Sequence, residues 1–251
     1  MPDATVAQNF DSIAWRYDEH AAAQKRAAHE LLDFTPDVDP DRVLEPGCGT
    51  GIYTRMLARR HPRASIRAID LSPRMVEVAR DKIDEPNVAV EARDAEQQPR
   101  DEHDLISSSA TFQWFTDLRG TLGRYRRSLR QDGVLSFSYF GPRTYRELRT
   151  CLAEVTGQEQ ALDAADFADR SRLRELLNTY FRSYRAEERR FRQDFDNLRD
   201  LLRSIKLTGA RGRRTGVRWT PGTLKRLERS YREHFGGIHA TYQVFLCRGR
   251  T

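Results

Sequence analysis

The stretch that decides the fold is Val43-Leu44-Glu45-Pro46-Gly47-Cys48-Gly49-Thr50-Gly51. A short apolar strand over 43–45 breaks into a loop whose glycines alternate as G-x-G-x-G, and the apolar spacing of 52–61 predicts an amphipathic helix after it. Glycines let a ligand approach the loop backbone, and the first N–H groups of the helix favour an anion such as an amino-acid carboxylate. Because dinucleotide-binding folds use G-x-G-x-x-G instead, this spacing disfavours NAD.

The alternation of strand and helix continues beyond the loop. Ser72 is a plausible N-cap with proline at the next position, and Asp132-Gly133 predicts a turn before a strand. Strands alternating with helices in this way indicate an α/β fold with a doubly wound, parallel sheet. The predicted strands cover 65–71, 87–95, 103–110 and 133–140, and the predicted helices cover 72–83 and 121–132.

The alternation lapses after about residue 142. Residues 10–34 and 144–180 look mainly helical, and we expect these two segments to cover the carboxyl edge of the sheet, where ligands bind in open α/β folds. A strand is expected within 182–195, helices over 197–206 and 221–234, and a last strand over 239–249. We therefore divide the chain into N-terminal helices over the site (1–36), an α/β core (37–142), a helical cap with the sixth-strand region (143–196), and C-terminal helices with a final strand (197–251).

Two acids follow the glycine loop at the ends of predicted strands. Asp70 ends the second strand, where a carboxylate can accept hydrogen bonds from two ribose hydroxyls, and Asp94 ends the third, within reach of an adenine amino group. The loop and both acids together describe a site for S-adenosylmethionine and leave NAD, or a sheet without any ligand, as weaker alternatives. The residues expected to hold this cofactor are Tyr17, Gln24, Glu45, Gly47, Gly49, Gly51, Asp70, Leu71, Met75, Asp94, Ala95 and Ser109.

Charge is unevenly distributed along the chain. Lys+Arg number 43 against 37 Asp+Glu, a net charge of +6. The stretch 169–232 holds 19 cations and 8 acids, a surplus of 11, so the remainder carries a net charge of −5. Arginine-rich composition is one explanation, and a surface for an anionic partner is the other. Three cysteines without CxxC spacing and six histidines without an HExxH motif predict neither a disulfide framework nor a metal site. We expect a cytoplasmic protein without a membrane segment, because no apolar run approaches the length of a bilayer span.

The loop and the two acids resemble the class I S-adenosylmethionine-dependent methyltransferases over 38–142 and the last strand. The similarity extends further, to the malonyl-acyl-carrier-protein O-methyltransferases of biotin synthesis. It is carried by FDSIAWRYDEHAAAQKRAAHELL (10–32), Gln113-Trp114, GVLSFSYFGPRTYRELR (133–149), LRSIKLTGA (202–210), TPGTLKRLERSY (220–231) and TYQVFLCRG (241–249). The chain departs from the family pattern at Glu45, where aspartate is usual, at Ser109, where asparagine is usual, and at Thr111, where alanine is common.

The resemblance implies a mostly parallel, seven-stranded, Rossmann-like methyltransferase sheet with a helical cap. It also implies methylation of the free carboxylate of a malonyl thioester, on acyl carrier protein or on coenzyme A. A carboxylate is already ionised at neutral pH and needs no general base, but a buried one needs donors. Arg143, Arg149 and Lys206 are our candidates for that role, and Gln113 and Trp114 are expected to wall the substrate pocket.

Two alternatives for the substrate remain. Gln-Trp also occurs in methyltransferases of other small carboxylic acids, such as the trans-aconitate family. The basic stretch 169–232 suits docking of an acidic carrier protein. The basic character of the chain also raises the hypotheses of an RNA methyltransferase and of a non-catalytic protein that binds S-adenosylmethionine or RNA. SSSATFQW at the end of the fourth strand differs from the Asn-Pro-Pro-Tyr type of amine site, and no RNA-binding module is visible, so nucleic acid is disfavoured.

Overall fold

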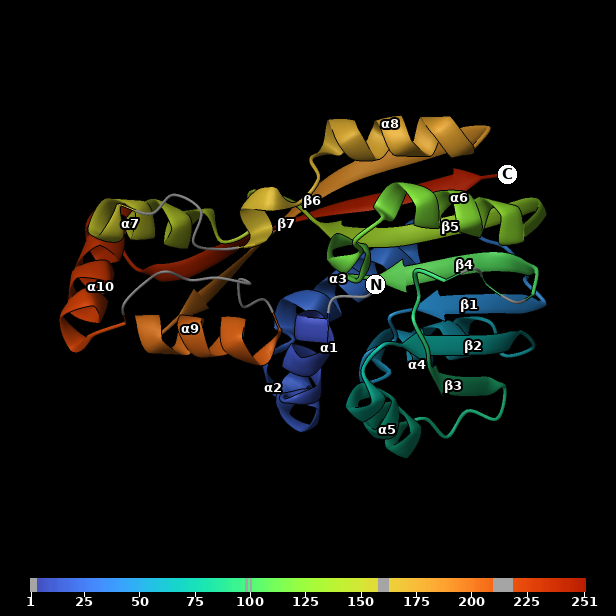
Figure 1. The fold of residues 1–251 in the computed structure, drawn as a ribbon, viewed down its shortest axis with the longest axis horizontal. Helices are drawn as coiled ribbons and strands as arrows, with labels where there is room; N and C mark the ends of the chain where they lie inside the picture. The colour runs from blue at the N-terminus through green and yellow to red at the C-terminus, as the bar shows by residue number, and fades with distance from the viewer. Residues whose placement is uncertain (1–3, 98, 100, 158–162, 210–218) are drawn as a thin grey trace.

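A seven-stranded sheet runs through the centre of the computed structural model, which describes residues 4–97, 99, 101–157, 163–209 and 219–251. The strand order is β3-β2-β1-β4-β5-β7-β6, with β1 to β5 parallel and β7 antiparallel to both of its neighbours (Figure 1). The doubly wound, mostly parallel sheet expected from the sequence is therefore confirmed. The strands are β1 Arg42–Pro46, β2 Ser65–Asp70, β3 Val88–Ala92, β4 His103–Ser109, β5 Leu129–Phe140, β6 Ser183–Phe195 and β7 Ile238–Arg250.

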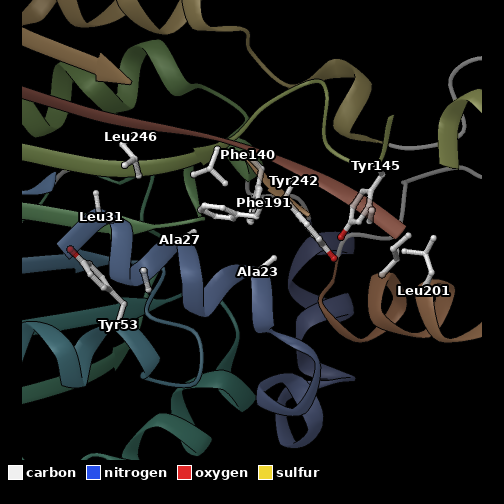
Figure 2. Close-up of a cluster of buried hydrophobic side chains, with 14 of the residues drawn as sticks. Ala23, Ala27, Leu31, Tyr53, Phe140, Tyr145, Phe191, Leu201, Tyr242 and Leu246 are labelled. Atoms are coloured by element: carbon white, nitrogen blue, oxygen red, sulfur yellow. The ribbon is translucent and has the colours of Figure 1, made fainter. Parts of the chain in front are cut away.

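Helices cover both faces of the sheet. On one face the small residues Ala23 and Ala27 let α3 approach the sheet closely, and Leu31 and Tyr53 complete the packing with α4 (Figure 2). The predicted cap of α5 is confirmed, since Ser72 Oγ accepts from Met75 N–H. The α-helices are α1 Ala4–Asp11, α2 Tyr17–His20, α3 Ala22–Phe34, α4 Ile52–Arg60, α5 Pro73–Lys82, α6 Leu118–Ser128, α7 Arg146–Thr156, α8 Arg170–Tyr180, α9 Leu198–Leu207 and α10 Pro221–Phe235, and 3-10 turns lie at Ala14–Arg16, Phe112–Trp114 and Asp163–Asp166.

The prediction of a helix to residue 132 followed by a turn is wrong. Helix α6 ends at Ser128, and β5 already begins at Leu129, which is buried and pairs with His103. Asp132 has a φ of 60° within the strand, and the register with β4 is irregular there. The polar residues therefore form a bulge inside β5, because burial of Leu129 keeps the backbone in the sheet.

Helix α8 does not cover the carboxyl edge of the sheet as expected. Its residues Leu173, Leu176 and Leu177 pack into the same apolar cluster as Leu122 and Tyr125 of α6, so it lies beside α6 on the second face of the sheet (Figure 1). The apolar stripe of the helix decides this position, because it must be buried against the sheet. Residues 158–162 of the predicted helical segment lie outside the described residues.

The last two strands extend past the rest of the sheet. β5 pairs with β7 only over 244–250, whereas β6 pairs with β7 along its full length. Residues 238–243 and 190–195 thus form a two-stranded ribbon, on which α7, α9 and α10 pack (Figure 1). This ribbon reaches beyond the carboxyl end of β5, and β6 is an edge strand of the sheet.

Candidate active site

A cavity lies at the carboxyl ends of β1, β2 and β4, and the N-terminal helices form its opposite wall. It encloses about 1040 Å³ of empty space, its open mouth included. The structure brings all of the predicted cofactor residues except Gly51 to this cavity: Tyr17, Gln24, Glu45, Gly47, Gly49, Asp70, Leu71, Met75, Asp94, Ala95 and Ser109 line it.

The glycine loop is shaped by close contacts that only glycine permits. Gly47 has a φ of 72°, and a Cβ there would lie 2.2 Å from the Thr111 side chain. Gly49 donates its N–H to Asp70 Oδ2 at 2.8 Å, and Ser72 N–H donates to Asp70 Oδ1 at 2.9 Å. Burial raises the pKa of Asp70, and these two bonds oppose that effect. The loop therefore holds the Asp70 carboxylate in one orientation at the end of β2.

Glu45 is buried in the wall of the cavity without compensation. Desolvation raises the pKa of its carboxyl to about 8, and the nearby Asp70 adds to the rise. Its Oε2 atom has no hydrogen-bond partner within the described chain. A buried carboxylate in this state is stabilised by a positive charge beside it. The carboxyl groups of the cavity thus suit a ligand that carries a positive charge, as S-adenosylmethionine does on its ammonium and sulfonium groups.

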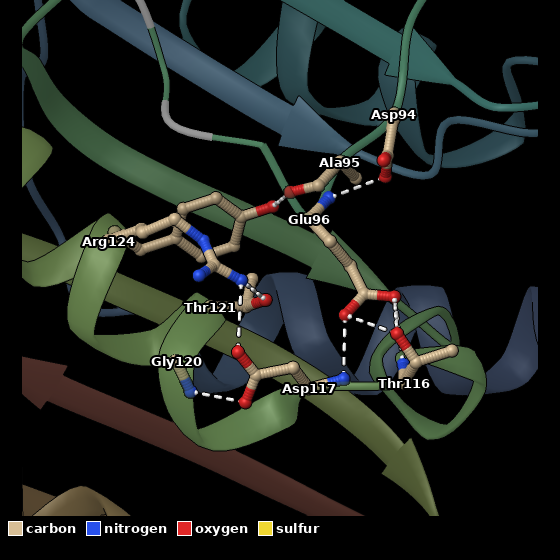
Figure 3. Close-up of polar contacts among 9 residues, drawn as sticks. Asp94, Ala95, Glu96, Thr116, Asp117, Gly120, Thr121 and Arg124 are labelled. Atoms are coloured by element: carbon tan, nitrogen blue, oxygen red, sulfur yellow. Dashed lines mark hydrogen bonds and ion pairs between the residues drawn. The ribbon is translucent and has the colours of Figure 1, made fainter. Parts of the chain in front are cut away.

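Asp94 and Glu96 shape the loop after β3. Asp94 Oδ1 accepts from Glu96 N–H at 2.9 Å, and the Glu96 carboxylate accepts from the backbone N–H groups of Thr116 (2.8 Å) and Asp117 (2.7 Å) (Figure 3). Glu96 thus ties the β3 loop to the start of α6, and it also lines the cavity. The sequence prediction missed Glu96, although it stands two residues after the predicted Asp94.

Two acids hold the N-terminal helices against the glycine loop. Asp18 Oδ1 accepts from Thr50 Oγ1 at 2.5 Å, and Asp18 Oδ2 pairs with Lys82 Nζ at 2.7 Å. Asp11 Oδ1 accepts from the hydroxyl of Ser72 and from Arg74 N–H. The segment 4–20 is thereby attached to the loop and to the start of α5, which closes one side of the cavity.

A second, smaller cavity adjoins the first. Phe10, Tyr17, Gln24, Ala110 and Trp114 line both, so the two cavities are direct neighbours. Gln113 and Trp114 lie in its wall, where the sequence places the substrate pocket. The remaining lining residues are Phe140, Thr144, Tyr145, Phe167, Thr208 and Tyr242, and the sequence prediction missed Tyr145 and Tyr242.

The three cationic candidates for the substrate carboxylate line neither cavity. Arg143 is exposed, and its backbone N–H donates to Gln243 Oε1 at 2.9 Å. Arg149 donates from Nη1 to the carbonyl of Pro142 at 2.7 Å, and burial lowers its pKa. Lys206 is exposed on α9. The structure thus does not bring these three side chains to the site.

The described residues contain no group of three or more His, Cys, Asp or Glu side chains that could hold a metal ion. Within the same ranges, no helix has the length and apolar character needed to cross a bilayer.

Comparison with known proteins gives the family. A protein from Acetivibrio thermocellus named malonyl-[acyl-carrier protein] O-methyltransferase is 34% identical over 269 residues, which cover 100% of this chain and 95% of that protein. A protein from Ilyobacter polytropus named malonyl-[acyl-carrier protein] O-methyltransferase 1 is 35% identical, covering 92% of this chain and 87% of that one. The chain belongs to the malonyl-acyl-carrier-protein O-methyltransferase family. The resemblance read from the sequence is confirmed.

Two further comparisons agree with this family. Residues 43–133 match the family model described as a methyltransferase domain. The crystal structure of the YcgJ protein from Bacillus subtilis superposes with a TM-score of 0.64 at 17% identity, covering 90% of this chain and 98% of that one. At that identity the similarity shows the fold, which is the one expected for a malonyl-acyl-carrier-protein O-methyltransferase.

Proposed function

We propose that the protein transfers a methyl group from S-adenosylmethionine to the free carboxylate of malonyl-acyl carrier protein, or of malonyl-coenzyme A. The product is the methyl ester that starts pimeloyl and biotin synthesis, and the reaction takes place in the cytoplasm. The observation that carries this proposal is the pair of neighbouring cavities: the larger is lined by the residues expected to hold the cofactor, and Gln113 and Trp114 lie in the wall of the smaller. Family membership over nearly the whole chain supports the substrate.

The cofactor site is proposed residue by residue. Asp70 accepts hydrogen bonds from the two ribose hydroxyls, and Asp94 from the adenine amino group. Glu45 faces the ammonium group, whose charge offsets the burial of its carboxyl. The N-terminus of α4, directly after the glycine loop, favours the carboxylate end of the methionine. Tyr17 and Gln24 close the site from the N-terminal helices.

The reaction needs positioning more than acid or base chemistry. The cofactor supplies an electrophilic methyl group on a sulfonium sulfur. The substrate oxygen forms a bond to that carbon while the carbon–sulfur bond breaks, and the electron pair goes to sulfur, so the anion and the cation neutralise each other. No proton moves, because the carboxylate is ionised at neutral pH. The chain's own contribution is therefore to align the two groups and to exclude water with the segment 4–34.

The division of the chain follows from these roles. Residues 1–36 cover the cofactor, 37–142 bind it, 143–196 supply part of the substrate wall and the sixth strand, and 197–251 complete the sheet. The boundary at 142/143 falls between β5, whose Phe140 lines the second cavity, and α7.

The carrier protein docks on the basic helices after β6. The arginines of β6 itself are paired within their strand: Arg189 with Glu187, Arg190 with Glu188 and Arg192 with Asp194. In contrast, Arg199, Arg203 and Lys206 of α9 are exposed at helical spacing, and α9 leads directly to Thr208 in the second cavity. Residues 210–218 of the basic stretch lie outside the described residues. Because carrier proteins are characteristically acidic, long-range attraction to this helix raises the association rate.

The decisive experiment uses the purified protein with labelled S-adenosylmethionine. Malonyl-carrier protein, malonyl-coenzyme A, free trans-aconitate and RNA are offered separately, and label in the malonyl methyl ester is the expected result. Label in aconitate or RNA but not in a malonyl thioester overturns the assignment. Arg203→Glu is expected to raise KM for malonyl-carrier protein several-fold and to leave KM for malonyl-coenzyme A unchanged, which separates docking from catalysis.

A further inference from the structure

Two tyrosines from distant parts of the chain meet in the wall of the second cavity. Tyr145 directly precedes α7, and Tyr242 belongs to the ribbon of β7 that extends past β5. Their ring centroids are 5.1 Å apart at an interplanar angle of 67°, and the two side chains are almost completely buried. Their hydroxyl oxygens point toward one another (Figure 2). The two phenol groups therefore form a polar spot in a wall that also holds the apolar rings of Phe140 and Phe167.

The backbone of Tyr145 adopts an energetically unfavourable conformation. Tyr145 has a φ of 58°, a left-handed conformation that residues other than glycine seldom adopt. Its N–H donates to the carbonyl of Thr241 at 2.9 Å. The buried Glu147 carboxylate accepts from Thr241 N–H at 3.0 Å and from Thr241 Oγ1 at 2.6 Å. The start of α7 is thus fastened to β7 at the residue next to Tyr242, and strain of this kind clusters at functional sites.

Two other donors of this cavity are engaged by backbone carbonyls. Thr208 Oγ1 donates to Ser204 O at 2.9 Å, and Gln113 Nε2 donates to Ala110 O at 2.6 Å. In the described part of the chain, the hydroxyls of Tyr145 and Tyr242 meet each other instead. Burial raises the pKa of both phenols, so both keep their protons at neutral pH. The phenol pair, which also contacts Thr208 and Ser204, therefore offers O–H groups that can turn toward an incoming anion.

No lysine, arginine or histidine lines the second cavity among the described residues. We propose that Tyr145 and Tyr242 are the receptor for the substrate carboxylate, and this proposal rests on the proposed function. A guanidinium would engage both carboxylate oxygens in a bidentate pair. Two phenols that converge on one oxygen leave the other oxygen unbound, so that it can attack the methyl carbon. Once that bond has formed and the carbon–sulfur bond has broken, the ester no longer carries the charge that the phenols bound, which favours product release.

The test compares the substrate with its own product. Tyr145→Phe and Tyr242→Phe each keep the ring and remove one donor. Each is expected to raise KM for malonyl-carrier protein about tenfold, since a hydrogen bond to a charged group is lost. The inhibition constant of the methyl ester product, and the Kd of S-adenosylhomocysteine, are expected to change less than about twofold, because neither ligand presents the carboxylate to this spot.

Tyr231→Phe is the matched control. Tyr231 is also fully buried, and its hydroxyl donates to His239 O at 2.8 Å, but it lines neither cavity. This variant is expected to lower the melting temperature and to leave the ratio of substrate KM to product inhibition constant unchanged. A raised ratio in both cavity variants but not in the control supports the receptor.

Two results overturn the receptor. One is an unchanged KM in both cavity variants, and the other is a parallel rise of KM and of the product inhibition constant, which indicates a structural role only. If Arg143→Ala or Arg149→Ala raises KM and the tyrosine variants do not, that arginine binds the substrate carboxylate instead. If the wild-type protein methylates trans-aconitate and no malonyl thioester, the proposed function fails, and the same variants measured with aconitate then decide the receptor separately.

Discussion

Glu45 makes the stability of the protein depend on pH in a predictable direction. The pKa of its carboxyl is about 8 in the folded protein against an ordinary value of 4.5. A raised carboxyl pKa means that the unfolded chain ionises first, so stability is fully present below pH 4.5 and is lost as the pH rises toward 8. At roughly 1.4 kcal/mol per pKa unit, the loss is on the order of 3 kcal/mol at pH 7 and approaches 5 kcal/mol above pH 8. Glu45→Gln keeps the shape of the side chain without the charge, so it avoids this loss.

The assay is urea unfolding of the ligand-free protein between pH 4 and pH 9. Wild type and Glu45→Gln are expected to have similar free energies of unfolding near pH 4, and the variant is expected to become progressively more stable as the pH rises. A difference that stays constant across this range refutes the reasoning. Because a cationic ligand restores the ionised form, binding of S-adenosylmethionine to the wild type at pH 7 is expected to release a proton. Calorimetry in buffers of different ionisation enthalpy measures this proton, and Glu45→Gln is expected to release none and to bind more weakly.

The other predictions concern the loop, the N-terminal attachment and acid stability. Asp70→Ala is expected to weaken S-adenosylhomocysteine binding about 100-fold by calorimetry, because two charge-assisted hydrogen bonds to ribose are lost, and unchanged affinity removes Asp70 from the site. Gly47→Ala is expected to cost about 2–4 kcal/mol of unfolding free energy, and adding Thr111→Ala relieves only the steric part of that cost. Asp18→Asn is expected to speed S-adenosylhomocysteine dissociation in stopped-flow measurements, and an unchanged rate contradicts a closing role for the N-terminal helices. Burial lowers the pKa of His103 from 6.5 to about 4, so stability is expected to fall as the pH drops through that window, and His103→Asn is expected to flatten this fall.

The sheet was predictable because its signals are local. β1, β2 and β5 contain short apolar runs that end at Pro46-Gly47, Asp70 and Gly141-Pro142, and such a run specifies a strand without knowledge of its neighbours. The segment after Ser128 was not predictable, since Arg130, Gln131 and Asp132 continue the polar pattern of α6. Long-range contacts keep it in β5, among them the pairing of Leu129 with His103 and the hydrogen bond from Thr251 Oγ1 to the carbonyl of Arg130. The position of α8 likewise depends on which apolar surface of the sheet the other helices leave uncovered. That surface cannot be identified from the sequence alone.

The residues of the site also fall into a group that was predictable from the sequence and a group that was not. The glycine loop, Asp70 and Asp94 lie at strand ends, and parallel strands bring their carboxyl ends to one edge, so their proximity followed from the order of the elements. Tyr145 and Tyr242 come together only through the Glu147–Thr241 contact between α7 and β7, a long-range pairing with no local signal. The arginine candidates failed to reach the cavity for a different reason. A long arginine side chain has many orientations, and Arg149, which donates to the carbonyl of Pro142, does not line the second cavity.

The ion pairs along β6 have a consequence for how the molecule behaves in crowded solution. An edge strand of this length presents unpaired backbone groups to any other chain, and such edges seed aggregates. Here Glu187 lies between Arg185 and Arg189 and forms ion pairs with both. The side-chain charges along this edge strand therefore alternate in sign over short distances. A second copy of the strand could pair its backbone with β6 only if these charged side chains were desolvated. The free-energy cost of that desolvation disfavours the pairing. Replacing both Glu187 and Glu188 with valine would turn the same strand into a template for fibrils.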